Sequence, residues 1–318
     1  MTALVVPPGR VGTRPVVGYA MVLGAAVLFA FNGTVSKLVL QAGLDARHLT
    51  ELRCTVALVV LVALAVATGP ARLRVTWREL PWLAVYGVVG YAMVQWLYYV
   101  AIERLPVGIA LLFEFTAPLM VALWARFGGG QQVRRRVWFA LGLCLAGLAC
   151  VAQVWGGGTL DGVGIAAGLA SAVALATYYV LGERAIGSRD TLSVACWAFA
   201  FAALLWAVVE PWWLFPFEVL TRDAASGLPV WVLLLYVVSG GTVIPFLLIL
   251  SGMRHLSATT AGIVGMTEPV IASLIAWVLI GEHLTTPQLL GGAAVLVGIV
   301  IAQTARRPAP TVPAEFPL

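Results

Sequence analysis

Ten long apolar stretches, separated by short polar segments, run along the chain. They lie near residues 16–40, 48–69, 81–101, 107–126, 137–155, 162–182, 192–214, 229–252, 258–280 and 287–305. A helix crosses a bilayer with about 20 mostly apolar residues, because each residue adds about 1.5 Å of rise. The stretches are continuous and do not alternate as the strands of a membrane barrel do. The pattern predicts an all-α polytopic membrane protein with ten transmembrane helices.

The composition agrees with a membrane location. Of the 318 residues, 61% are hydrophobic and 10% are charged, and the mean hydropathy is +0.98. A soluble domain carries about 25% charged residues, so soluble enzymes are nearly excluded. The four cysteines lie in apolar stretches without metal-ligand spacing, and no P-loop is present, so no metal and no cofactor are expected. The first stretch is long enough to stay in the membrane as a signal anchor.

The distribution of arginine predicts the orientation of the chain. If the N-terminus is cytoplasmic, fourteen arginines fall in inside segments and three, Arg47, Arg104 and Arg222, fall in outside loops. Short cytoplasmic loops carry such an excess of basic residues. Both termini are therefore expected in the cytoplasm, with tails at residues 1–15 and 306–318. These arginines occupy separate loops rather than one face, so their positive charge does not indicate nucleic-acid binding.

The two halves of the chain resemble each other. An alignment of one on the other matches Pro118 with Pro269 and Gln153 with Gln303. Five spans is an odd number, so the second half must enter the membrane from the opposite side, as inverted-topology repeats do. Such halves can exchange conformations about one central site, which alternating access requires. A duplication that only built a stable bundle is the alternative. The predicted repeats are residues 16–155 and 162–305.

Two motifs carry a resemblance to a known family. They are "EPVIASLIAWVLIGEHLTTPQLLGG", from Glu268 to Gly292, and "FEFTAPLMVALWARFGGG", from Phe113 to Gly130. Together with ten spans in two halves, they resemble the EamA family of the drug/metabolite transporter superfamily over nearly the whole chain. The resemblance implies a bacterial inner-membrane carrier, and the FEFTAP form is similar to the threonine and homoserine exporters. The first half departs from the pattern, since Gln131 and Gln132 stand where the second half has Glu282 and His283.

Two prolines and two glutamates lie inside predicted spans. Pro118 and Pro269 each remove a helical hydrogen-bond donor, which predicts kinks that serve as hinges, with a simple packing kink as the alternative. Glu114 and Glu268 would lie within the hydrocarbon layer, where a charge costs roughly 2.5 to 3.5 kcal/mol. A wet cavity, a bound cation or protonation offsets that cost. Both glutamates are thus predicted to bind a substrate ammonium or to couple protons. A protonated glutamate that only bonds a neighbouring helix is the alternative.

Further polar and aromatic residues inside the spans complete the predicted site. Lys37, the only lysine, is expected to face the cavity and to bind a carboxylate or pair with Glu51, unless its long side chain reaches the interface instead. Glu51 and Arg53 are predicted to form an interfacial ion pair and are left outside the site. Deeply placed amides need polar partners, and tyrosines offer an apolar face with a polar end. The residues added on these grounds are Asn32, Gln95, Tyr99 and Tyr178.

Small residues recur every four positions in the fifth and tenth spans, which suits close helix packing within the chain or in a homodimer. The two series are Gly142, Ala146 and Cys150, and Ala294, Gly298 and Ala302.

The sequence therefore predicts a secondary transporter rather than an enzyme. Its expected substrate is a small polar metabolite, such as an amino acid or a related compound, moved outward across the inner membrane by alternating access, with protons as a candidate coupling ion. Two alternatives stay open. One is a regulatory or partner-binding membrane protein that transports nothing, and the other is an intramembrane transferase, which the missing HExxH and GxSxG patterns disfavour.

Overall fold

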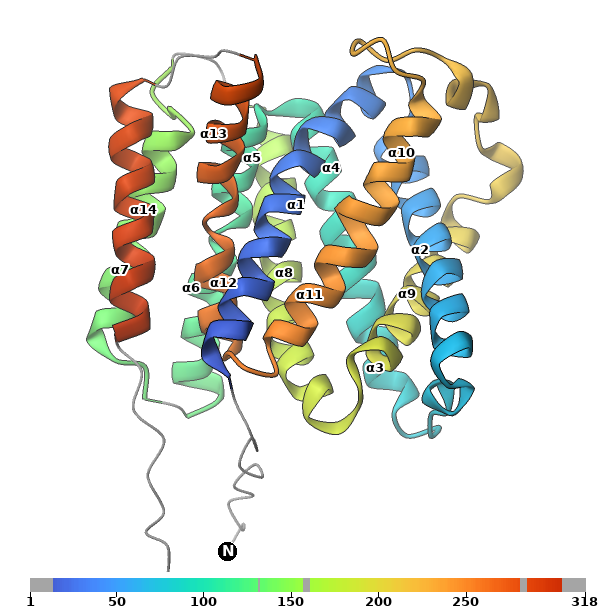
Figure 1. The fold of residues 1–318 in the computed structure, drawn as a ribbon, viewed down its shortest axis with the longest axis horizontal. Coiled ribbons are helices and arrows are strands. Elements are labelled where there is room, and N and C mark those ends of the chain that lie inside the picture. The colour runs from blue at the N-terminus through green and yellow to red at the C-terminus, as the bar shows by residue number, and fades with distance from the viewer. Residues whose placement is uncertain (1–13, 131, 157–160, 281–284, 305–318) are drawn as a thin grey trace, which may run out of the picture.

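The computed structural model describes residues 14–130, 132–156, 161–280 and 285–304. Within these ranges the chain is helical, and the only strand-like pairing is a single bridge between Asp223 and Pro229. The predictions made for most of the two tails and for Gln131, Glu282 and His283 lie outside the described residues. Figure 1 shows that α1 begins and α14 ends at the same end of the helical bundle.

The helices of the first half follow the predicted apolar stretches closely. A π-helical turn, Val88–Met93, joins the third helix to the fourth, and a second one, Trp124–Gly128, follows the sixth. The helices are α1 (Pro15–Gln41), α2 (Ala46–Thr68), α3 (Leu80–Gly87), α4 (Val94–Arg104), α5 (Val107–Glu114), α6 (Ala117–Leu123) and α7 (Arg135–Val151).

The second half repeats this order of elements. Its own π-helical turn, Ser239–Val243, joins α10 to α11. The helices are α8 (Gly162–Ser188), α9 (Thr191–Val209), α10 (Val230–Val238), α11 (Ile244–Gly252), α12 (Ala258–Gly265), α13 (Glu268–Ile280) and α14 (Thr286–Thr304).

Short polar residues set several of the helix starts. The side chain of Asp45 accepts hydrogen bonds from the first amides of α2, and Asp161, Asp190 and Ser257 cap α8, α9 and α12 in the same way. Such caps satisfy amides that have no partner inside the helix. The stretch predicted to reach residue 214 ends instead at Val209, because the residue before a proline avoids the helical conformation and Pro211 follows Glu210.

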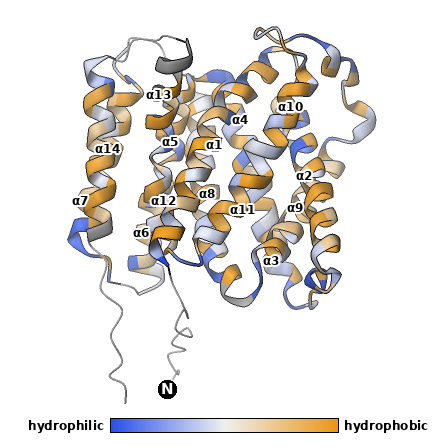
Figure 2. Cartoon of the chain, in the orientation of Figure 1, coloured by the Kyte–Doolittle hydropathy of each residue, from blue (hydrophilic) through white to orange (hydrophobic). Residues whose placement is uncertain are grey.

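The chain is a multi-pass membrane protein. Figure 2 shows hydrophobic residues along the helices and hydrophilic residues gathered toward both ends of the bundle. Among the described residues, eight segments are long and apolar enough to cross a membrane. They are Pro15–Gln41, Ala46–Thr68, Leu80–Arg104, Val107–Gly128, Gly162–Ile186, Thr191–Val209, Val230–Gly252 and Ala258–Ile275. The shorter helices α7 and α14 occupy the other two predicted stretches, and the count of ten spans stays a prediction.

Helices α7 and α14 pack against each other at one side of the bundle (Figure 1). Their backbones meet at Gly147 and Gly291, where a β-carbon on either glycine would lie 2.5 to 2.6 Å from the carbonyl oxygen of the other. Of the predicted series in α7, Cys150 lies against Gly291, whereas Gly142 and Ala146 are exposed, so a homodimer contact through these two stays a prediction. The buried face is instead the one that carries Cys144 and Gly147, and it meets Gly298 and Val295 of α14.

This contact predicts opposite effects for two glycine substitutions in α7. Gly147→Ala places a methyl group against the backbone of α14, and we expect the free energy of unfolding to fall by about 1–3 kcal/mol, as overpacking does. Gly142→Ala is the matched control, because no heavy atom lies within 4 Å of its added carbon. Alanine also favours a helix more than glycine does, so Gly142→Ala should keep or raise the melting temperature. Equal melting temperatures for the two variants in detergent would contradict the packing.

Candidate functional site

Two helices are interrupted at their prolines. The helical run of α5 ends at Glu114 and resumes in α6, whose second residue is Pro118. In the second half, α12 ends at Gly265 and α13 begins with Glu268, directly before Pro269. Proline has no amide hydrogen, so the carbonyl groups four residues before each proline lose their helical donor. Both glutamates therefore lie at a break in a membrane helix.

Threonine hydroxyls complete these two breaks in the same way. Thr116 Oγ1 donates to the Phe113 carbonyl at 2.7 Å, and Thr267 Oγ1 donates to the Val264 carbonyl at 2.8 Å. In each half the hydroxyl donates to the carbonyl directly before the one that the proline leaves without a helical donor, which is that of Glu114 or Gly265. The two halves thus match in these threonine-to-carbonyl hydrogen bonds as well as in their prolines.

A cavity of about 80 Å³ lies between helices of both halves, next to the two breaks. That space holds several water molecules, since one water needs roughly 10–15 Å³ of such volume. Its wall is largely aromatic and aliphatic, but eight side chains bring polar or charged groups to it. These are Asn32 of α1, Arg53 of α2, Gln95 and Tyr98 of α4, Glu114 of α5, Tyr178 and Tyr179 of α8 and Glu268 of α13.

Among the described residues, the carboxyl of Glu114 has one hydrogen-bond partner. Its Oε1 lies 3.1 Å from the hydroxyl of Ser171, and the same hydroxyl lies 3.2 Å from the carbonyl oxygen of Val94. The serine has a single hydrogen, and a carbonyl can only accept. If Glu114 is ionised, its carboxylate and the carbonyl compete for that hydrogen. If Glu114 is protonated, it donates to Ser171, which donates to Val94, and both contacts become hydrogen bonds.

Glu268 and Gln95 line the cavity without partners. Gln95 is 2% exposed, and neither atom of its amide has a hydrogen-bond partner among the described residues. No hydrogen bond reaches the Glu268 carboxyl from that part of the chain either. Buried polar groups are rarely left unpaired, because each costs free energy comparable to a lost hydrogen bond. Both side chains are therefore open to water or to a bound ligand.

Arg53 is the residue that the sequence did not place in the site. It is 2% exposed and lines the cavity, where its guanidinium donates to Thr242 Oγ1, to the Tyr99 hydroxyl and to the Gly241 carbonyl. Its carbon Cζ also lies 5.5 Å from the centre of the Tyr99 ring. The predicted ion pair with Glu51 is not formed, since both carboxyl oxygens of Glu51 are buried without a hydrogen-bond partner.

Two of the three acceptors of Arg53, Gly241 and Thr242, lie in the π-helical turn between α10 and α11. Pro245 has no amide hydrogen, so it cannot donate to the carbonyl of Gly241, four residues earlier. The chain forms a π-helical turn at this point, and Thr242 Oγ1 donates to the carbonyl of Val237 within it. A proline therefore leaves the Gly241 carbonyl available to Arg53, which lies on a helix of the other half.

The predicted residues Asn32, Tyr99 and Tyr178 surround this arrangement. Ser36 Oγ lies 3.3 Å from Asn32 Oδ1 and 3.4 Å from the Tyr99 hydroxyl, which joins α1 to the Arg53 cluster. Tyr178 lines the cavity, and its ring packs edge-on against Phe246 with a centroid separation of 5.5 Å. Tyr99 does not reach the cavity wall itself, but it contacts Arg53.

Lys37 lies apart from the cavity. Its Nζ is 3.4 Å from the carbonyl oxygen of Leu105, and its side chain lines a separate pocket of about 370 Å³ together with Asp45 and Glu103. The structure therefore does not bring Lys37 together with Glu114 or with Glu51.

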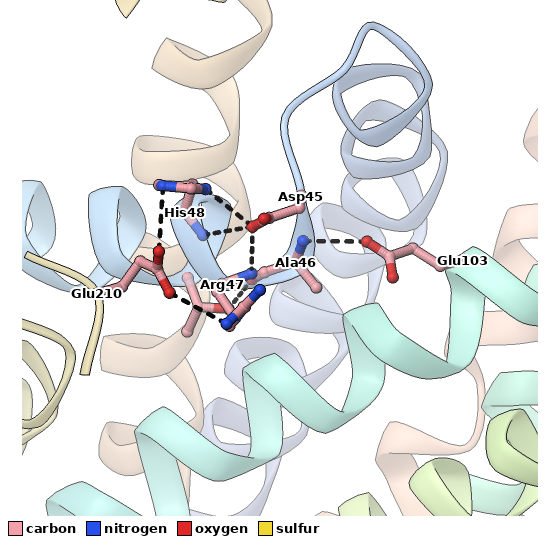
Figure 3. A network of polar contacts seen from close by, with 7 residues as sticks. Asp45, Ala46, Arg47, His48, Glu103 and Glu210 are labelled. Carbon is pink, nitrogen blue, oxygen red and sulfur yellow. Dashed lines mark hydrogen bonds and ion pairs between the residues drawn. The ribbon is translucent and has the colours of Figure 1, made fainter. Parts of the chain in front are cut away.

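A second polar network, shown in Figure 3, includes Asp45 and Glu103, which also line the Lys37 pocket. His48 lies between Asp45 Oδ1 at 3.0 Å and Glu210 Oε1 at 3.5 Å, and Arg47 Nη1 lies 3.4 Å from Glu210. Glu103 accepts a hydrogen bond from the amide of Ala46 at 3.0 Å. The network ties the start of α2 to the end of α4 and to the residue that follows α9.

A model of the EamA-like transporter family matches residues 16–153 and 162–304, and the chain belongs to this family of membrane transporters. One solved crystal structure superimposes with a TM-score of 0.73 over 90% of this chain and 96% of that chain. The two sequences are 22% identical, so this similarity concerns the fold alone.

Several curated relatives are also transporters by name. The chain is 30% identical over 290 residues to an uncharacterized transporter of Archaeoglobus fulgidus, a match that covers 90% of this chain and 96% of that protein. It is 28% identical over 293 residues to the threonine/homoserine exporter RhtA of Escherichia coli K12, covering 91% and 92%. It is 26% identical over 293 residues to the inner membrane transporter YicL of Salmonella typhimurium, covering 89% and 94%.

The close approach of α1 to the π-helical turn predicts that position 241 accepts only glycine. A β-carbon on Gly241 would overlap Asn32, with its Cγ only 2.6 Å away. We expect Gly241→Ala to push the turn away from α1 and to lower the melting temperature in detergent by several degrees. Gly24→Ala, also between α1 and α11, is the control, because its added carbon would meet Leu248 at an ordinary 3.7 Å. A stable Gly241→Ala protein would show that the two segments are not held this closely.

Proposed function

We propose that this protein is a secondary transporter that moves an amino acid or a related small polar metabolite outward across the bacterial inner membrane by alternating access. The observation that carries the proposal is the cavity, because helices of both halves contribute two carboxyl groups and one guanidinium to it. Charged groups inside a membrane protein are costly unless they serve a substrate or ion pathway. The described cavity has the polar lining and the apolar walls typical of a small-molecule site.

The proposed architecture is ten spans in two inverted five-helix repeats, with α7 and α14 as the last span of each. Three matching features of the two halves support it: the π-helical turns after α3 and α10, the proline breaks after α5 and α12, and the threonine hydroxyls beside those breaks. An even number of spans agrees with α1 beginning and α14 ending at the same end of the bundle (Figure 1). The arginine distribution supports a cytoplasmic location for that end.

The interruptions at Pro118 and Pro269 are the proposed hinges. Discontinuous membrane helices commonly form the substrate sites of transporters built from inverted repeats. A helix that is already broken beside the cavity can change direction there without losing further backbone hydrogen bonds. Each hinge would then move one of the two glutamates, since Glu114 and Glu268 lie at the breaks themselves.

The proposed substrate class and direction rest on the relatives and on the charges of the cavity. The similarity to a protein named as a threonine/homoserine exporter supports an amino acid moved outward. The carboxyls of Glu114 and Glu268 supply partners for a substrate ammonium. Asn32, Gln95 and Tyr178 supply neutral polar contacts at the same cavity.

Protons are the proposed coupling ion, and Glu114 is their proposed carrier. The hydrogen bonds around Ser171 are complete only when Glu114 holds a proton, as described above. An arriving substrate ammonium would favour the ionised carboxylate, because an opposite charge nearby stabilises the charged form. Substrate and proton would then compete for the Glu114 carboxylate, so that substrate binding releases a proton and the two fluxes are coupled.

Flux measured with purified protein tests the proposed function. Proteoliposomes loaded with single amino acids should release at least one of them several-fold faster than protein-free vesicles loaded in the same way. Unlabelled substrate added to the opposite side should drive exchange. If no member of a broad amino-acid panel moves faster than in protein-free vesicles, the protein is not a transporter of this class.

Replacement of Glu114 tests the coupling. Gln cannot release a proton, so we expect Glu114→Gln to lower transport driven by an imposed pH gradient by about tenfold or more, an effect of the size found for proton-transfer groups. Exchange of substrate for substrate needs no net proton movement and should persist. Glu218→Gln is the matched control, because Glu218 is exposed and lies away from the cavity. Full pH-driven transport by Glu114→Gln would remove this residue from the coupling role.

A further inference from the structure

We propose that Arg53 binds the carboxylate of the substrate, so that the cavity selects molecules that carry both a carboxylate and an ammonium. The inference rests on the proposed transport function and adds the recognition of the substrate's negative end. It assigns this specificity to a residue on α2, which meets acceptors from the other half of the chain.

In the described part of the chain, the guanidinium of Arg53 is hydrogen-bonded only to neutral groups. Its three hydrogen bonds go to neutral oxygen atoms, those of Thr242, Tyr99 and Gly241. No ion pair joins it to a carboxylate among the described residues. A buried charge is normally paired, because leaving it without a counterion is costly. A ligand carboxylate would supply the missing negative charge.

Arg53 has N–H donors that its hydrogen bonds within the protein do not use. A guanidinium has five N–H donors, and the three observed hydrogen bonds use one on Nε, one on Nη1 and one on Nη2. One donor therefore stays available on each of the two terminal nitrogens. A carboxylate accepts from an arginine through both of its oxygens, and such bidentate pairs are short and strong.

Groups of opposite charge type share the wall of this cavity: Arg53 lines it together with Glu114 and Glu268. They nevertheless form no ion pair with one another. Charges of opposite sign that line a cavity without pairing match a ligand that carries both charges. A zwitterion could place its carboxylate at Arg53 and its ammonium at the glutamates.

Contacts from two other helical segments fix the position of the Arg53 guanidinium. The Gly241 carbonyl lacks a helical donor because of Pro245, the Thr242 hydroxyl follows it, and the Tyr99 hydroxyl and ring approach from α4. These contacts orient the planar guanidinium before a ligand arrives, which lowers the entropic cost of binding. Lysine has no planar fork and could use these acceptors only in part.

The wild-type protein provides the first test. Each of L-threonine, L-homoserine and L-leucine is compared with its own carboxamide as a competitor of amino-acid exchange in proteoliposomes. The amide has nearly the same shape but no negative charge. We expect the amide to compete about 10- to 100-fold more weakly, the range of a hydrogen bond to a charged group converted at 1.36 kcal/mol per factor of ten.

Two variants then assign this selectivity to Arg53. In Arg53→Gln the guanidinium is gone, so the preference for the acid over its amide should fall to about one, whatever the remaining rate. In Arg53→Lys the positive charge is kept, and part of the preference should return. Arg136→Gln is the control, because Arg136 is an exposed residue of α7. A residue that only stabilised the fold would change the rate or the yield but not this ratio.

The outcomes separate the inference from the proposed function. If the wild type exchanges an amino acid and its amide equally well, the role of Arg53 is wrong while transport stands. If Arg53→Gln keeps the wild-type preference, the carboxylate is recognised elsewhere and the inference also fails. If Arg53→Gln does not fold, Arg53→Lys decides in its place. A full wild-type preference for the acid over its amide in Arg53→Lys would likewise overturn the assignment, because lysine cannot form the bidentate pair. If nothing in the panel moves, the proposed function fails and the inference falls with it.

Discussion

The need to satisfy every backbone polar group inside the bilayer governs this structure. Hydrocarbon offers no hydrogen bonds, so a membrane helix can be interrupted only where protein or trapped water supplies partners. Pro118, Pro245 and Pro269 each interrupt a helix next to the same cavity. Threonine hydroxyls and the guanidinium of Arg53 supply donors there. The backbone carbonyls that the prolines leave without a helical donor therefore lie beside this cavity.

Much of the fold could be predicted from the sequence, because hydrophobic length and proline chemistry act locally. The apolar stretches gave the positions of the helices to within a few residues, and the breaks appear at Pro118 and Pro269. Spacing alone gave only part of the contact face of α7, because a run of small residues marks a face that can pack without showing which face does so. Gly142 and Gly147 look alike in the sequence, yet only Gly147 meets a neighbouring backbone.

The candidate site was harder to predict, because sequence indicates how deep a residue lies but not the direction in which it points. Glu114 and Glu268 were recognisable from their cost in hydrocarbon. The sequence placed Lys37 in the site and left Arg53 outside it, whereas Arg53 lines the cavity and Lys37 lines a separate pocket. One local sign was present: Arg53 shares a stripe of α2 with the buried residues Leu49 and Ala57, which a helical projection of the sequence shows.

The contact between Gly147 and Gly291 limits how the molecule can change shape. There is no room for a side chain between the two backbones at this point, so α7 and α14 cannot slide past each other without a collision. The two helices would then move as one unit. In the proposed alternating access, the remaining helices would turn against this pair, to which both halves contribute one helix.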